Sequence, residues 1–349
     1  GAPGLMVPGG HQRTFPPRRL ISYATDDDPS NPLAGKVFVQ VAAGAFHSIA
    51  LENTGHLYSW GLGNEGRLGL GVSMGIDYAA RSNRLVATRM KHGPIDVASS
   101  LRGWVDFDTP AARGPADEAS ERDGVDEQAL TALQSAHCGG SHSCAIVGAS
   151  ERVLWMWGSN EFGQVGFGNR FDFGEPGQLD LPFQHRVGCI ALGRDHTVVS
   201  TQAQGNVVFT WGRNSSGQLG LGHADDVLSP KLVQNLDAVI QVAAGDDFTA
   251  VIVDDGKAYT WGEAECGKLG YGPSTKSGMQ NYPRLVNTTD TFAAVSCGAQ
   301  HTALINRKGQ LLTFGAGWYG RLGHGDMQNQ YEPKFVETLA MRNVLEVQC

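Results

Sequence analysis

The same spacing of glycines occurs five times along the chain, and it constrains the fold more than any other feature. In each copy, a Trp-Gly or Phe-Gly dipeptide is followed by glycines five, eight and ten residues after its own glycine. The dipeptides are Trp60-Gly61, Trp157-Gly158, Trp211-Gly212, Trp261-Gly262 and Phe314-Gly315. Each copy also has an upstream anchor glycine, and the anchors are Gly44, Gly139, Gly193, Gly245 and Gly298. A register kept this strictly indicates an internal repeat of about 53 residues.

Each repeat carries three apolar strand signals and a weaker fourth one. The first signal leads into the anchor glycine, as in Val239–Val242 of the fourth repeat. The second begins at the histidine position, as in His301–Ile305 of the fifth repeat. A third ends at the Trp-Gly dipeptide, as in Val207–Trp211. The fourth contains proline, which lacks an N–H donor and is tolerated on an outer strand. Four short antiparallel strands in about 50 residues describe a propeller blade, so the sequence predicts an all-β chain, a β-propeller of four-stranded blades.

Composition and charge exclude several classes of protein. Glycine accounts for 47 of 349 residues while apolar content stays at 41%, a combination that disordered and collagen-like chains do not have. No run approaches the ~18 apolar residues of a membrane span, so we expect no membrane insertion. The net charge of −8 argues against nucleic-acid binding, which needs a basic surface. Six cysteines without paired spacing indicate reduced thiols and a cytoplasmic location, with the nucleus as the alternative.

The third repeat gives the clearest likeness to a known family. Its phrase Gly193-Arg194-Asp195-His196-Thr197 leads on to Trp211-Gly212-Arg213-Asn214 and then to Gly217-Gln218-Leu219-Gly220. This pattern resembles the regulator of chromosome condensation (RCC1-like) repeat, whose members form seven-bladed propellers. The resemblance implies a single RCC1-like domain over 1–349, which we expect to be a segment of a longer protein. Five complete repeats are visible, near 37–71, 132–168, 186–222, 239–272 and 293–325.

Two residues depart from that pattern. Phe248 stands where histidine is usual, and Phe314 replaces the usual tryptophan. Both are bulky fillers, so we expect the packing to survive.

The gap between the first two anchor glycines is 95 residues, which is longer than one repeat by about 42. We interpret 97–130 as an acidic loop insertion; a degenerate blade is the alternative. Between Val105 and Gln128 there are eight acidic residues against two arginines, which would attract a basic partner. The candidate partner-binding residues of this insertion are Trp104, Phe107, Asp117, Glu118, Glu121, Asp123, Asp126 and Glu127.

Several motifs resemble chemical sites but favour structural roles. Gly61–Gly66 and Gly315–Gly320 fit G-x-G-x-x-G, yet glycine-rich turns rather than a helix follow each of them. A recurring histidine is interpreted as a hydrogen-bonding tie from its blade to the backbone of a neighbouring one, helped by the Ser or Thr after it. The four histidines at that position are His47, His142, His196 and His301.

Two further groups of residues could carry chemistry. His137, Cys138, His142 and Cys144 form a dense Cys/His cluster, but neighbours on a strand point to opposite faces, which argues against zinc. The pairs Asp225-Asp226 and Asp246-Asp247 are expected in turns, where aspartate bonds locally, and an interaction role for one pair stays open.

The sequence contains no nucleophile elbow, metalloprotease motif or phosphate loop. We therefore assign no catalytic, cofactor-binding or metal residues and expect a non-enzymatic protein–protein interaction scaffold. The alternative, which the resemblance implies, is a guanine nucleotide exchange factor. Expected partners are other proteins, such as a small GTPase or a basic partner of the insertion.

Overall fold

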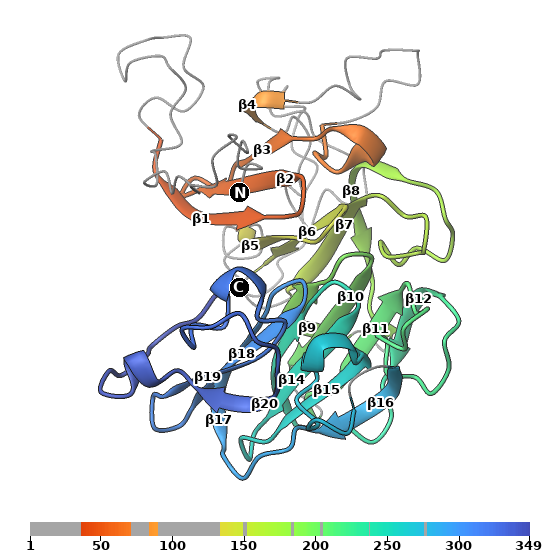
Figure 1. Cartoon of the computed structure of the whole chain (residues 1–349). Helices are drawn as coiled ribbons and strands as arrows, with labels where there is room; N and C mark the ends of the chain where they lie inside the picture. Colours follow the sequence, from red (N-terminus) through yellow and green to blue (C-terminus); the bar gives the residue numbers. More distant parts are fainter. Residues whose placement is uncertain are drawn as a thin grey trace, which may run out of the picture.

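The computed structural model describes residues 36–70, 84–89, 133–148, 152–182, 185–202, 205–236, 238–275 and 278–349. These residues form five four-stranded antiparallel sheets, and each sheet follows the order of the chain (Figure 1). In the described part of the chain, the only helical segments are short 3-10 turns. The predicted all-β fold of four-stranded blades is therefore confirmed.

Each sheet takes its strands from one repeat. The first contains β1 (Phe38–Ala43), β2 (His47–Glu52), β3 (Leu57–Gly61) and β4 (Arg84–Arg89). The second contains β5 (Leu133–Cys138), β6 (His142–Val147), β7 (Val153–Gly158) and β8 (Phe173–Leu179). The third contains β9 (Arg186–Leu192), β10 (His196–Gln202), β11 (Val208–Gly212) and β12 (Val227–Leu232). The fourth contains β13 (Val239–Ala244), β14 (Phe248–Val253), β15 (Ala258–Glu263) and β16 (Met279–Leu285). The fifth contains β17 (Phe292–Cys297), β18 (His301–Asn306), β19 (Leu311–Gly315) and β20 (Gln330–Phe335).

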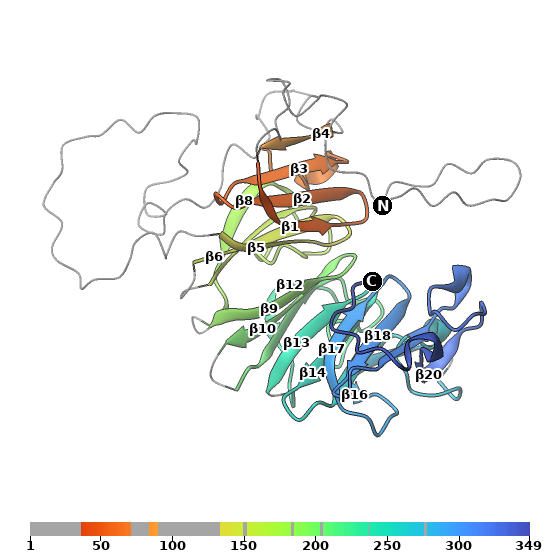
Figure 2. The same ribbon diagram turned by 90° about the vertical axis from the view of Figure 1, so that its left-hand side faces the viewer.

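The sheets stand beside one another with their first strands toward a common centre. Strands β1, β5, β9, β13 and β17 contact one another in that order, as Figure 2 shows. Pro230, Pro283 and Pro333 lie in β12, β16 and β20, the outermost strands of their sheets. The predicted outer position of the proline strand is therefore confirmed.

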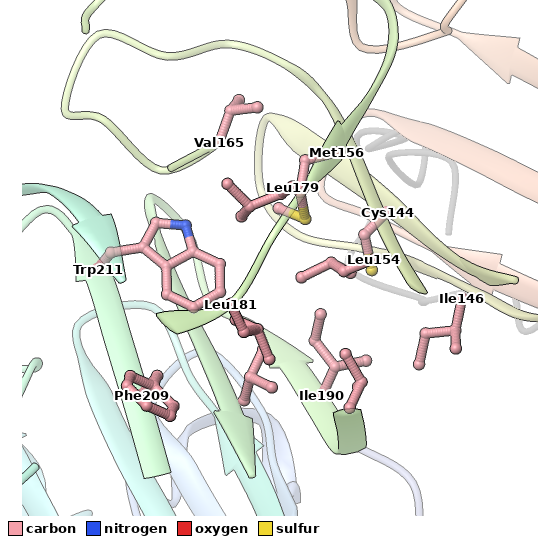
Figure 3. Packing of buried hydrophobic residues seen from close by; sticks show 12 residues of the cluster. Cys144, Ile146, Leu154, Met156, Val165, Leu179, Leu181, Ile190, Phe209 and Trp211 are labelled. Atoms are coloured by element: carbon pink, nitrogen blue, oxygen red, sulfur yellow. The ribbon is translucent and has the colours of Figure 1, made fainter. Parts of the chain in front are cut away.

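The core consists of apolar layers between neighbouring sheets. Between the second and third sheets, Leu154 and Met156 of β7 pack with Phe209 and Trp211 of β11 (Figure 3). Full burial of an aromatic or aliphatic side chain contributes about 2–3 kcal/mol, so these layers supply most of the driving force for assembly. Phe248 and Phe314 are also fully buried, as expected for fillers of the histidine and tryptophan positions.

The recurring dipeptide glycine has one register in all five sheets. It pairs directly with the residue at the histidine position, as Gly212 does with His196. Gly212 has a φ of +103°, and a Cβ built there would lie 2.5 Å from the carbonyl oxygen of Asp195. Only glycine meets both constraints, which explains why the sequence repeats it.

Candidate functional site

A histidine at the start of the second strand joins each of the first three sheets to the next one. Its Nε2 lies within hydrogen-bond distance of a hydroxyl on the following sheet. The pairs are His47–Ser143 at 2.7 Å, His142–Thr197 at 2.9 Å and His196–Thr249 at 3.0 Å. The structure thus brings these histidines to neighbouring blades, as the sequence predicted, although their direct partner is a side chain.

The same hydroxyl reaches the backbone of the preceding sheet. Thr197 Oγ1 donates to the carbonyl oxygen of Gln164 at 2.8 Å, and Trp211 Nε1 donates to that oxygen at 2.9 Å. Because the threonine proton is used there, the imidazole of His142 must donate through Nε2. The other two joints repeat this arrangement on the carbonyl oxygens of Arg67 and Gln218.

The joint between the fourth and fifth sheets is built differently. Both departures from the repeat pattern, Phe248 and Phe314, fall at this joint. Among the described residues, Thr302 Oγ1 is the one side-chain donor to the carbonyl oxygen of Lys268, at 2.8 Å. Lys268 is fully buried; its ammonium group pairs with Glu263 and donates to Gln300 Oε1. At this joint two phenylalanines thus occupy the positions of histidine and tryptophan, and a buried lysine paired with the partly exposed Glu263 lies beside them.

Burial keeps the joint histidines neutral. Desolvation lowers the pKa of His47 to about 4 and that of His142 and His196 to about 3. The Nδ1 atoms of these three histidines and of His301 are buried without a hydrogen-bond partner in the part of the chain described. The three histidine joints are thus uncharged elements of the scaffold at neutral pH.

The other motifs that resembled chemical sites are engaged in local structure. Gly61–Gly66 leads into a three-residue 3-10 turn, Asn64–Gly66. Asp226 accepts a hydrogen bond from the backbone of Asn214 at 3.0 Å and pairs with Arg170 at 3.1 Å.

The four residues of the Cys/His cluster have different neighbours. His137 bonds to Ser135 at 3.0 Å, Cys138 contacts the carbonyl oxygen of Ala42, and Cys144 is buried in the core. His142 belongs to a joint. Over the described ranges, no group of three or more Cys, His, Asp or Glu residues is placed to hold a metal ion.

A cavity of about 900 Å³ opens at the centre of one face. Loops that follow the first strands of all five sheets line it, together with the turns after the third strands. We call it the central cavity. Its charged lining residues are Glu65, Arg67, Glu161, Arg194, Asp195, Arg213 and Asp246. No sequence signal marks the three arginines as a group, because they come together only when the repeats assemble.

The pair Asp246-Asp247 lies in the turn between β13 and β14, as predicted. Desolvation raises the pKa of both carboxyl groups. The charge of Asp247 raises the pKa of Asp246 further, and the charge of Glu263 raises that of Asp247. Asp247 accepts a hydrogen bond from Gln218 Nε2 at 3.2 Å. Raised carboxyl pKa values in a cavity are typical of functional positions.

The candidate residues of the acidic insertion, Trp104 to Glu127, lie outside the described residues. Their role therefore stays a prediction. Among the helices of the described residues, none is both long and apolar enough to cross a membrane.

Known proteins resemble this chain over most of its length. It is 32% identical over 304 residues to the ultraviolet-B receptor UVR8 of Arabidopsis thaliana, covering 86% of this chain and 58% of the receptor. It is 29% identical over 323 residues to the human E3 ubiquitin-protein ligase HERC2, covering 91% of this chain and 6% of the ligase. The chain thus spans less than two thirds of these relatives.

Solved structures share the fold. Human WBSCR16 matches with a TM-score of 0.68 at 23% identity, over 90% of this chain and 70% of that one. Yeast RCC1 (Prp20), solved with Kap60, matches with a TM-score of 0.58 at 20% identity, over 89% of this chain and 78% of that one. The model of the RCC1-like domain matches residues 33–349. The chain belongs to the RCC1-like domain family.

Proposed function

We propose that this chain is a non-enzymatic protein–protein interaction module and that its central cavity lies at the docking surface. The observation that carries the proposal is the convergence of loops from all five sheets on one cavity. The hydrogen-bonded joints beneath these loops make a rigid support for them. Binding residues are commonly placed on loops that a rigid scaffold positions.

The rim of the cavity has the composition of a protein-binding surface. Phe46 is 64% exposed, and the guanidinium group of Arg67 lies 6.0 Å from its ring. Arg213 lies 4.9 Å from the ring of Phe162. Aromatic residues and arginine are enriched at interfaces and in their hot spots, because they bury much surface and also form polar contacts.

Affinity capture with matched variants tests the proposal. Phe46→Ser changes the rim of the cavity, whereas Phe171→Ser changes a residue that is 77% exposed and does not line it. We expect the first variant to lose the captured partners and the second to retain them. Equal capture by both variants, or no capture by the unaltered chain, would contradict the proposal.

The second candidate is guanine nucleotide exchange on a small GTPase. Its support is the likeness of fold to yeast Prp20, whose solved structure is described together with its binding to Gsp1p and histones. Release of a fluorescent guanine nucleotide from a panel of small GTPases measures this activity directly. Unchanged release rates throughout would eliminate it.

We also propose a cytoplasmic location. All six cysteines are free, as expected for a reducing compartment. Imaging of the tagged full-length protein would test this.

A further inference from the structure

We propose that the central cavity accepts an arginine side chain of a protein partner and that the carboxylate of Asp246 forms the ion pair with it. This inference rests on the proposed function and names the partner's chemistry. It follows from the pairing of charges in the cavity, the position of Asp246 and the nature of the aromatic rim.

The arginines that line the cavity are already paired with carboxylates. The ion pairs are Arg67–Glu65 at 2.5 Å, Arg213–Asp195 at 3.6 Å and Arg194–Asp195 at 3.8 Å. Asp195 also accepts a hydrogen bond from Ser141 at 3.2 Å. Within the described residues, neither Asp246 nor Glu161 has a side-chain hydrogen bond or ion pair. The cavity therefore has unpaired negative charge and no unpaired arginine.

Asp246 is the better placed of the two unpaired carboxylates. Glu161 is exposed to solvent, whereas Asp246 is half-buried. The backbone of Asp246 is held on both sides: its N–H donates to Ala299 at 3.3 Å, and its carbonyl oxygen accepts from Arg194 at 3.3 Å. Burial raises the pKa of its carboxyl group, and the neighbouring Asp247 raises it further. The charges of Arg194 and Lys268 lower the pKa and offset part of this rise. A further cation beside the carboxylate would favour its ionised form.

The rim favours a guanidinium group over other ligands. An added anion would meet the unpaired carboxylates, and one half-buried carboxylate does not supply the several oxygen ligands of a metal site. Phe46 and Phe162 each already lie beside an arginine of this chain. Planar guanidinium groups stack on aromatic rings and pair with carboxylates, which suits them to such a setting.

The volume fits a segment of a protein rather than an isolated side chain. At about 900 Å³, the cavity is near the upper end of the ~300–1000 Å³ range of ligand pockets. An arginine could reach Asp246 while its flanking residues contact Phe46 and Phe162 at the rim.

Carboxyl NMR on the full chain with ¹³C-labelled aspartate tests the subsite directly. The probe is N-acetyl-L-arginine amide, and the matched neutral probe is N-acetyl-L-citrulline amide. We expect the arginine probe to lower the pKa of Asp246 by about one unit at saturation, since an opposite charge within ~4–6 Å has this effect. The citrulline probe should leave the titration unchanged. If Asp246 titrates identically with both probes, the inference is overturned.

Capture of partners separates failure of this inference from failure of the proposed function. Asp246→Asn keeps the shape of the side chain, and the control is Asp225→Asn, which changes an exposed aspartate away from the cavity. We expect only Asp246→Asn to weaken capture, by tenfold or more. If it retains every partner that Phe46→Ser loses, the docking surface stands and the arginine subsite is wrong. If no partner is captured at all, the proposed function fails, and the NMR titration alone decides the subsite.

Discussion

The imidazole of His196 donates to the hydroxyl of Thr249 at 3.0 Å, across the joint between the third and fourth sheets. That hydroxyl donates a hydrogen bond to the carbonyl oxygen of Gln218, which also accepts one from the indole N–H of Trp261. One carbonyl oxygen thus accepts hydrogen bonds from both the hydroxyl and the indole of the joint. This arrangement explains why the histidine, the following hydroxyl residue and the tryptophan recur together in the sequence.

Removing polar groups from a joint should lower stability stepwise. His142→Phe loses one buried hydrogen bond and should cost about 1 kcal/mol of unfolding free energy. Thr197→Val loses that bond and the bond to Gln164, and should cost about 2 kcal/mol. Urea denaturation measures both values. Thr289→Val, at an exposed position, is the control and should change the free energy of unfolding little. Equal losses of unfolding free energy in all three variants would contradict the role of the joint.

Acid should destabilise the protein through the same histidines. Their pKa values are about 3 to 4 in the folded chain and about 6.5 when unfolded, so below pH 6.5 the unfolded state binds more protons. Stability that is fully present above pH 6.5 is therefore lost as the pH falls toward 3 to 4. Each histidine contributes up to about 1.4 kcal/mol per pH unit.

The urea midpoint, measured from pH 7.5 down to pH 4.5, checks this dependence. His142→Phe removes one titrating group and should make the decline shallower. A slope unchanged by that variant would show that the loss comes from other groups.

Two glycine substitutions should separate backbone strain from steric overlap. Gly267 and Gly320 occupy the same repeat position, with φ values of +83° and +71°. A Cβ at Gly267 would lie 2.6 Å from the carbonyl oxygen of Gln330, whereas a Cβ at Gly320 meets nothing within 4 Å. Gly320→Ala should therefore cost about 1 kcal/mol and Gly267→Ala distinctly more. Melting temperatures compare the two, and equal shifts would exclude the overlap.

Asp246→Asn should make the protein slightly more stable at neutral pH. The folded-state pKa of Asp246 is raised, so ionisation opposes folding at pH values above it. The amide removes this penalty. The gain in melting temperature should be present at pH 7 and disappear near pH 3, where the aspartate is protonated in both states. A loss of stability at pH 7 would mean that Asp246 supports the fold.

Deletion of Val105–Gln128 tests the interpretation of the acidic insertion. If 97–130 is a loop, the melting curve should stay nearly intact, because such an acidic segment buries little apolar surface. Any association with a basic partner that depends on this charge should be lost, and in the intact chain it should weaken with added salt. Unfolding after deletion would favour the degenerate blade instead.

The repeat, its strands and the scaffold roles of its recurring residues can be inferred from the amino-acid sequence alone. Glycines at positive φ and an edge proline in three of the repeats have local causes, which act within one repeat and so leave a periodic trace. A buried aromatic such as Trp211 recurs because the same contact between neighbouring sheets recurs. A hydrogen bond from His142 to the neighbouring blade could be anticipated because the histidine recurs, but its partner, the hydroxyl of Thr197, could not. The acidic insertion breaks this period, and its residues can be interpreted only by composition.

The central cavity, and the pairing of its charged residues, become visible only in the assembled fold. Arg67, Asp195 and Asp246 belong to three different sheets, and no spacing in the sequence shows that their loops converge. The assembled fold also shows that Phe248 and Phe314 lie at one joint, where the buried Lys268 pairs with Glu263. Such relationships depend on how successive sheets pack against one another. The charge left on Asp246 is therefore a property of the assembled sheets and of no single repeat.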